Sequence, residues 1–346
     1  MTAAVPAHFR QQIAACRNLG SPFTAKVLET VLAMLEQPAA APWTAALLGW
    51  RGDPQADALA LRLAGALHRI VRDGDSELAA AYAAGRIDAA RIDAALGRHG
   101  DVLARYLQSP PQTNEPQRSA MLLGGFLVIA AETGRPLACR EIGASAGLNL
   151  LWPDYACDFG DWHYGDAATA PLVLQAGWSG PRPPQAQILL HSRAGCDRAP
   201  LDAGNADDRE RLLSYVWADQ TARLQRIAAA LDHAAGQAVT PLQQDAGDFV
   251  TAQLAARPAD AAFVLYHSIV WQYLPADEKQ RISRAMEQAG AAATENAPLA
   301  WLRLEAGAAT DGAELLLTLW RGNGRAAETR LLGIGDYHGR WMRWLA

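Results

Sequence analysis

Residues 137–151 read LACREIGASAGLNLL, and this stretch decides the fold that the sequence predicts. We expect a short strand at residues 137–143 and a helix that opens at residues 145–152, with a glycine-rich turn between them. Gly143 and Gly147 allow the backbone to turn sharply and to approach a ligand closely. The start of the helix offers free N–H groups. The stretch therefore predicts a cradle for a nucleotide-type cofactor.

The chain after this turn alternates between short apolar runs and amphipathic runs. Further strands are expected at residues 187–193, 239–243, 262–269 and 299–305, with helices at 207–236, 249–256 and 276–290. Two last strands, at 314–320 and 329–334, are joined by a loop with Gly322, Asn323 and Gly324 that suits a hairpin. Such alternation builds a sheet with helices on both faces. We therefore expect an α/β fold with a Rossmann-like, mostly parallel sheet that closes with an antiparallel hairpin.

The chain before the turn shows helical periodicity only. Apolar residues recur at helical spacing, as in Leu63, Leu67 and Ile70. Residues 109–116 are rich in Pro, Gln, Thr and Asn and mark a boundary, after which a helix is expected at 117–134. The sequence thus predicts an all-helical domain at residues 1–113 and an α/β domain at 114–346, with an insertion at about 153–186.

The composition is typical of a packed globular protein. The 346 residues are 50% hydrophobic and 19% charged, with a net charge of −5 and a pI near 5.9. No basic surface is predicted, so we expect no nucleic-acid partner. The longest apolar run, residues 120–131, is too short to span a bilayer, so we expect no membrane contact. The four cysteines lack zinc or disulfide spacing, which predicts no metal and a cytoplasmic protein with reduced thiols.

Three kinds of ligand-binding turn are comparable with residues 141–150. The dinucleotide pattern G-x-G-x-x-G fails, because Ser145 stands where its second glycine belongs. A P-loop fails because no lysine follows. The turn resembles that of class I S-adenosylmethionine-dependent methyltransferases, acid-x-G-x-G-x-G, with Glu141, Gly143 and Gly147 in place and Ser145 for the middle glycine. This resemblance implies S-adenosylmethionine as the cofactor and a methyltransferase of unknown acceptor.

The methyltransferase resemblance, limited to about residues 137–334, implies cofactor contacts at several strand ends. Glu141 would face the positively charged methionine end of the cofactor. Asp197, preferred to Asp202, would bind the ribose hydroxyls, and Asp245 would accept from the adenine amino group, with Asp248 as a helix N-cap. The whole expected set of cofactor-binding residues is Glu141, Gly143, Ser145, Gly147, Asn149, Asp197, Asp245, His267 and Ser268.

The catalytic edge is expected after the strand at residues 262–269. His267 would accept a proton from the methyl acceptor, if one needs removing, and Trp271 or Tyr273 would face the sulfonium through cation–π attraction. We therefore expect His267 and Tyr273 to be the catalytic residues. A small molecule is the expected acceptor, with a carboxylate or phosphate as a suitable group for basic residues. Its expected binding residues are Asn114, Glu115, Arg118, Trp271, Gln272, His338 and Arg340.

Residues 143–147 also read G-x-S-x-G, the nucleophile elbow of α/β serine hydrolases. Asp311 or Asp336, and then His338, follow Ser145 in the chain order that such a triad needs. A hydrolase elbow, however, follows several strands of its sheet, and here the chain before residue 137 is helical. A serine hydrolase using Ser145 stays as one alternative. A non-catalytic ligand-binding protein on the same fold, or a tight turn with no ligand, is the other.

The chain as a whole resembles a bacterial family, the domain of unknown function numbered 2332. The resemblance runs nearly end to end. It rests on Ser21-Pro22, Asn114-Glu115 with Arg118, residues 141–149, Asp197 with Pro200-Leu201-Asp202, Val216-Trp217 with Gln220, His267-Ser268 with Gln272-Tyr273, and residues 338–341. It implies little about chemistry, because no activity is assigned to the family.

Overall fold

The chain folds into two compact units. The computed structural model describes residues 4–37, 41–322, 324 and 326–346, so Asn323 of the predicted hairpin loop lies outside the described residues. Unit 1 comprises Met1–Thr113 and Asn205–Ala228, and unit 2 comprises Asn114–Gly204 and Ala229–Ala346. Residues 205–228 therefore belong to the helical unit, whereas the sequence pattern assigned them to the α/β domain.

Unit 1 is built from helices around one hydrophobic core. The central helix is α4 (Leu59–Arg72), which contacts most of the others and buries one face completely, because Leu59, Leu63, Ala66 and Leu67 recur at helical spacing. The other helices are α1 (Ala4–Asn18), α2 (Pro22–Leu35), α3 (Pro42–Leu48), α5 (Ser76–Ala83), α6 (Ala89–Arg98), α7 (Gly100–Gln108) and α9 (Ala206–Ser214). The helix α10 (Thr221–Ala235) crosses from unit 1 into unit 2.

The prediction of a single long helix at residues 207–236 is wrong, because the helix is interrupted between α9 and α10. The break is fixed by tertiary hydrogen bonds that the local sequence does not show. Nδ1 of His68 donates to the carbonyls of Ser214 and Val216, at 3.2 and 2.9 Å. The carboxylate of Asp219 accepts hydrogen bonds from the N-terminus of α2. These partners turn the backbone out of the helical path.

Unit 2 contains a mixed, mostly parallel nine-stranded sheet in the order β5-β12-β11-β10-β9-β8-β1-β6-β7. The strands are β1 (Leu137–Ile142), β5 (Gly177–Ser179), β6 (Leu190–Asp197), β7 (Leu242–Gln243), β8 (Ala262–Ser268), β9 (Leu299–Ala306), β10 (Ala313–Trp320), β11 (Glu328–Gly335) and β12 (Trp341–Trp344). The neighbouring strands β7, β6, β1, β8 and β9 run parallel to one another. The strands β9, β10, β11 and β12 form an antiparallel meander. β1 and β8 are buried along their whole length, as central strands of a covered sheet should be.

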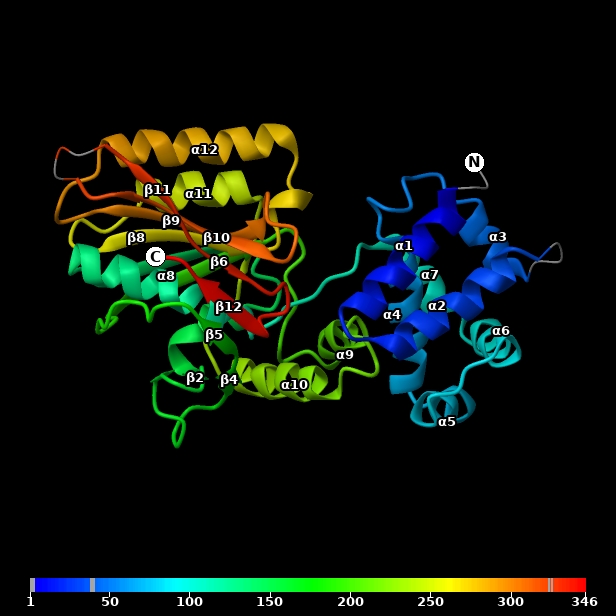
Figure 1. Cartoon of the computed structure of the whole chain (residues 1–346). Coiled ribbons are helices and arrows are strands. Elements are labelled where there is room, and N and C mark those ends of the chain that lie inside the picture. The colour runs from blue at the N-terminus through cyan, green and yellow to red at the C-terminus, as the bar shows by residue number, and fades with distance from the viewer. Residues whose placement is uncertain (1–3, 38–40, 323, 325) are drawn as a thin grey trace. The chain divides into compact units, whose positions relative to one another are not determined.

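Helices cover both faces of this sheet (Figure 1). α11 (Ala246–Ala255) and α12 (Ala276–Ala291) pack together on one face, and α8 (Arg118–Thr133) packs on the other. Gly124 and Gly125 let α8 approach the sheet closely, because a Cβ on either would lie within 2.5 Å of Trp344 or Leu302. The unit is therefore an α/β layer structure in which β1 lies inside the sheet, between β6 and β8.

The insertion after β1 forms a small sheet and also supplies an edge of the large one. The small sheet has the order β3-β2-β4, from β2 (Ala156–Asp158), β3 (His163–Tyr164) and β4 (Val173–Gln175), and β5 then pairs with β12. The helix expected from residue 145 is a 3-10 helix, η1 (Leu148–Asp154), and a second one, η2 (Trp271–Tyr273), follows β8. Among the described residues, no helix has the length and apolar character needed to cross a membrane.

Candidate functional site

The candidate site lies at the carboxyl ends of β1, β6 and β8. After β1 the chain adds β6 and β7 on one side of β1, and it then adds β8 and β9 on the other side. The direction in which strands are added to the sheet therefore reverses at β1. Open α/β sheets bind ligands at such a switch point. The turn after β1 has three residues with left-handed backbone: Gly143 (φ +69°), Ser145 (φ +53°) and Gly147 (φ +76°). The predicted turn is therefore tight, and it stands where the topology places a ligand crevice.

Asp197, at the end of β6, holds this turn in place. One carboxylate oxygen accepts the backbone N–H of Ser145 at 2.9 Å, and the other accepts the N–H of Ala199 at 3.0 Å. The carbonyl of Ser145 in turn accepts the N–H of Leu201 at 3.3 Å. The sequence predicted that Asp197 binds the ribose hydroxyls, whereas in the structure its two carboxylate oxygens accept hydrogen bonds from backbone N–H groups.

Glu141 is a buried carboxyl group at the end of β1. It is 2% exposed, and its hydrogen-bond donor is the hydroxyl of Tyr266, its register partner on β8, at 3.4 Å. The same hydroxyl lies 3.1 Å from the carbonyl of Asn149. Burial raises the pKa of Glu141 to about 8, and the hydroxyl of Tyr266 and the charge of Arg118 offset this only in part. The carboxyl end of β1 thus carries an acid that stays largely protonated at neutral pH.

The glycines of the turn face protein atoms at close range. A Cβ on Gly143 would lie 2.4 Å from Val270, and one on Gly147 would lie 3.2 Å from Pro241. Val270 follows β8, and its N–H donates to Glu305 at 3.1 Å. The side chain of Val270 therefore occupies the space in front of Gly143.

Ser145 lacks the partner that a nucleophile needs. Its side chain is 2% exposed, and its Oγ makes no hydrogen bond within the part of the chain that the structure describes. A serine nucleophile requires a base within hydrogen-bond reach. The left-handed backbone of Ser145 is compatible with a nucleophile elbow, but the arrangement around Oγ does not favour the hydrolase alternative.

His267 is fully buried, and both of its ring nitrogens are hydrogen-bonded. Nε2 accepts from the indole N–H of Trp301 at 3.1 Å, so Nδ1 carries the hydrogen and donates to Glu305 at 2.6 Å. Its ring stacks on Trp271 with centroids 5.2 Å apart. The predicted role of His267 as a proton acceptor differs from this arrangement, because neither nitrogen is open to a substrate. The structure gives His267 a part in joining β8 to β9.

Asp245 is the N-cap of α11, a role that the sequence assigned to Asp248. Its side chain accepts the N–H groups of Gly247 and Asp248 at 3.0 and 3.3 Å. The N–H groups of Ala246 and Gly247 also donate to Glu278 of α12, at 3.0 and 3.3 Å. Burial and the adjacent carboxylate of Asp245 raise the pKa of Glu278. The free N–H groups at the start of α11, where the adenine was expected, therefore already have acceptors in the protein.

The segment before α8 and the first turn of α8 meet the glycine-rich turn. Oδ1 of Asn114 accepts the N–H of Leu148 at 2.9 Å, and Ser119 donates to the side chain of Asn149 at 2.8 Å. Arg118 donates to the carbonyl of Ser268 at 3.3 Å and to that of Tyr337 at 3.0 Å. Arg118 therefore links the end of β8 to the turn before β12. Glu115, also a predicted site residue, is fully buried in this segment.

The remaining predicted substrate residues are spread over two turns. Arg340 makes a bidentate ion pair with the buried Asp336, at 3.0 and 2.6 Å, and His338 donates its backbone N–H to the same carboxylate at 2.9 Å. Burial opposes the charge on Asp336, but the hydrogen bonds from Arg340 outweigh it and lower its pKa. In η2, Trp271 is half-buried, Gln272 is exposed and Tyr273 is 69% exposed. Tyr273, a predicted catalytic residue, thus faces solvent.

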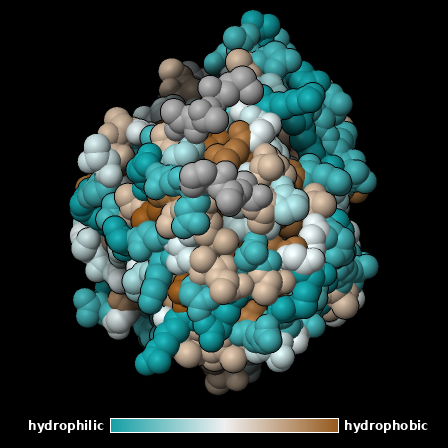
Figure 2. All heavy atoms as spheres, turned by 90° about the vertical axis from the view of Figure 1, so that its right-hand side faces the viewer, coloured by the Kyte–Doolittle hydropathy of each residue, from teal (hydrophilic) through white to brown (hydrophobic). Residues whose placement is uncertain are grey.

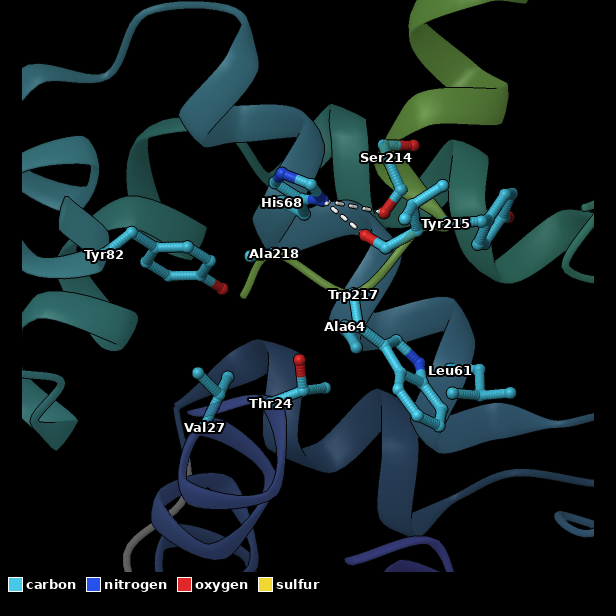
Figure 3. Close-up of a pocket in the computed structure, with 12 residues that line it drawn as sticks. Thr24, Val27, Leu61, Ala64, His68, Tyr82, Ser214, Tyr215, Trp217 and Ala218 are labelled. Carbon is cyan, nitrogen blue, oxygen red and sulfur yellow. Dashed lines mark hydrogen bonds between the residues drawn. The ribbon is translucent and has the colours of Figure 1, made fainter. Parts of the chain in front are cut away.

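Unit 1 contains a small cavity of its own beneath His68 (Figure 3). The hydroxyls of Tyr82 and Thr24 point into the space between the labelled residues, and burial lowers the pKa of His68 to about 4. The cavity, with a volume of about 20 Å³, has room for a water molecule and not for an organic ligand. A wider, open hollow of about 340 Å³ lies on unit 2, lined by residues 158–160 and 175–177 of the insertion.

The face seen from the side of the N-terminal helices is mainly hydrophilic (Figure 2). Hydrophobic side chains appear there as small spots separated by polar ones. Scattered apolar residues of this kind are normal on a protein surface. Among the described residues there is also no group of three or more His, Cys, Asp or Glu side chains arranged to hold a metal ion.

Comparison with known proteins identifies a family and no activity. Residues 6–344 match the model of a family described as an uncharacterized protein conserved in bacteria (DUF2332). The chain belongs to this family. Searches of curated proteins and of solved structures found no match. Membership of the family confirms the resemblance found in the sequence, and the site has to be interpreted from its own geometry.

Sequence reasoning missed four residues that shape the site. Tyr266 binds Glu141, Trp301 and Glu305 bind His267, and Val270 contacts Gly143. Glu305 offered a signal, because it is an acid at the carboxyl end of a predicted strand. Tyr266 interrupts an apolar strand and offered a weaker one. The role of Trp301 follows from strand pairing alone.

Proposed function

We propose that unit 2 binds S-adenosylmethionine at the carboxyl ends of β1, β6 and β8 and is a methyltransferase for a small-molecule acceptor. The strand order supports this proposal, because β7, β6, β1, β8 and β9 correspond to strands 3-2-1-4-5 of a doubly wound nucleotide-binding sheet. The glycine-rich turn follows the first of these strands. Its three left-handed residues form the kind of backbone loop that a cofactor approaches closely.

The observation that carries the proposal is the buried acid Glu141. A carboxyl group is rarely buried unless a cation or several donors compensate for the loss of water. Within the described residues, Glu141 has one hydrogen bond, from Tyr266, and burial raises its pKa to about 8. The ammonium group of the cofactor's methionine end would supply the missing cation. A dinucleotide phosphate at the same place would bring a negative charge and would supply no cation.

Arg118 carries a positive charge that acts on Glu141 from a distance and offsets its burial only in part. It is buried, and its charge acts on the pKa of Glu141. An amino-acid head group carries an ammonium and a carboxylate, so the charges of Glu141 and Arg118 are complementary to both of its charges. Residues 114–119 also touch the turn, because Asn114 accepts the N–H of Leu148 and Ser119 donates to Asn149. These contacts favour a ligand with a zwitterionic amino-acid end.

The cofactor would supply an activated methyl group for an in-line displacement. Such a reaction depends largely on positioning, so it does not require a general base. This agrees with His267, whose nitrogens are occupied by Trp301 and Glu305. The residues of the site would hold the methionine end and exclude water. The serine hydrolase alternative has no comparable support, because Oγ of Ser145 is buried and has no hydrogen-bond partner among the described residues.

Calorimetric titration with S-adenosylmethionine and S-adenosylhomocysteine tests the proposal. Both should bind the wild-type chain, and Glu141→Gln should bind about tenfold more weakly or worse, since a hydrogen bond to a charged group contributes about 1.5–3 kcal/mol. Glu132→Gln is the matched control, because Glu132 lies at the other end of α8 from Arg118 and pairs with Arg321 and Arg330. It should bind as the wild type does. Absence of binding to both compounds would refute the proposal, and binding without methyl transfer to any acceptor would leave a ligand-binding protein.

A further inference from the structure

Val270 stands at the switch point, directly in front of the glycine-rich turn. It follows β8, the strand that pairs with β1. A Cβ on Gly143 would lie 2.4 Å from Cγ2 of Val270 and 2.9 Å from its Cβ. The two residues are therefore in close contact. A ligand that approaches the backbone of Gly143 meets the Val270 side chain first.

Ile269, the residue before it, is held in a backbone conformation that its side chain disfavours. Its φ is +53°, and a residue branched at Cβ is a genuine outlier in this left-handed region. Such conformations persist only where the surroundings impose them, and they cluster at ligand clamps and switch segments. Here the N–H of Ile269 donates to the carbonyl of Leu304 at 2.9 Å, and the N–H of Val270 donates to Glu305 at 3.1 Å.

The anchors of this turn come from outside it. Leu304 and Glu305 belong to β9, and Arg118 holds the carbonyl of Ser268 at 3.3 Å. If Ile269 rotated to a negative φ, the chain would change direction at Val270, and the bond to Glu305 would break. A negative φ at Ile269 would relieve this strain and would withdraw Val270 from Gly143.

We infer that residues 269–271 form a gate over the crevice, in which Val270 closes the site and Ile269 is the residue whose backbone turns when it opens. The inference rests on the proposed function, because it assumes that the ligand reaches the backbone of Gly143. Such a ligand binds the open state only, so it shifts the population toward that state. The strain at Ile269 destabilises the closed state and so makes opening easier.

Substitutions of Ile269 test the strain without any ligand. Glycine and asparagine tolerate a left-handed backbone, so Ile269→Gly and Ile269→Asn should stabilise the closed gate. The amide hydrogen of Val270 is bonded to Glu305 in the closed gate, and its exchange with solvent, followed by NMR, measures opening. We expect about threefold slower exchange or better in both variants, and faster exchange in Val270→Ala. Equal or faster exchange in both Ile269 variants would overturn the inference.

Titration with S-adenosylhomocysteine tests the link to the site. Val270→Ala should bind about threefold more tightly or better, and both Ile269 variants should bind about threefold more weakly. The control is Val264→Ala, which shortens a buried residue in the interior of β8 and should leave the affinity unchanged. Equal affinity in all of these proteins would overturn the gate and leave the proposed function intact. If none of them binds, the proposed function fails, and the exchange rates alone decide whether the turn opens.

Discussion

Replacing Glu141 by glutamine should remove a pH dependence from the stability of the protein. Burial raises the pKa of Glu141 from its ordinary 4.5 to about 8, so the folded chain binds one more proton than the unfolded chain between these values. The stability that this proton contributes is complete below pH 4.5 and is lost as the pH rises through 8. The slope should approach about 1.4 kcal/mol per pH unit, and the whole loss should reach about 5 kcal/mol at most.

The assay compares urea unfolding of the wild type and of Glu141→Gln from pH 5 to pH 9, followed by far-ultraviolet circular dichroism. The side chain of the variant is uncharged and still accepts the hydroxyl of Tyr266, so it mimics the protonated acid. Using the difference between the two proteins at each pH cancels the titration of all other groups. The wild type should lose stability relative to the variant as the pH rises. A difference that stays constant over this range would show that Glu141 has an ordinary pKa, and the argument for a missing cation would fail.

Three further substitutions test other parts of the structure. Asp219→Ala removes the acceptor for the N–H of Phe23 at the start of α2 and should destabilise unit 1 by about 1 kcal/mol, measured by thermal unfolding. Asp197→Ala frees the N–H of Ser145, so that amide should exchange with solvent faster, and the fold should lose about 1–3 kcal/mol of stability. Unchanged exchange would contradict the role of Asp197 in holding the glycine-rich turn. A fluorophosphonate probe should leave Ser145 unlabelled, and labelling that disappears in Ser145→Ala would restore the hydrolase alternative.

The central strands of unit 2 were predictable because burial on both faces leaves a continuous apolar signal. β8 and β9 lie within a residue or two of their predicted positions. The short strands were not predictable in the same way. β5 and β12 exist because they pair with each other at the edge of the sheet, and β7 has two residues and exposed side chains. Their formation depends on neighbours that the local sequence does not contain.

The sequence predicted the location of the candidate site better than it predicted the roles of the individual side chains. Gly143, Ser145 and Gly147 do form a turn at the carboxyl end of β1, because glycine spacing reports local backbone geometry. The role of a polar side chain depends on its partner, and those partners are distant in the chain. His267 is occupied by residues of β9, and Asp197 binds the turn itself. Sequence pattern places such groups at a sheet edge, but pairing and register decide which of them remain available to a ligand.

The most direct test of the proposed function is the number of protons released when S-adenosylhomocysteine binds at pH 7. Calorimetric titrations in two buffers with different ionisation enthalpies measure this number. Because Glu141 has a pKa of about 8, it is mostly protonated at this pH, and the ammonium of the ligand should drive it to ionise. We expect release of about one proton by the wild type and of almost none by Glu141→Gln. Absence of binding, or equal proton release by the two proteins, would contradict the assignment of Glu141 as the group that receives the cofactor's charge.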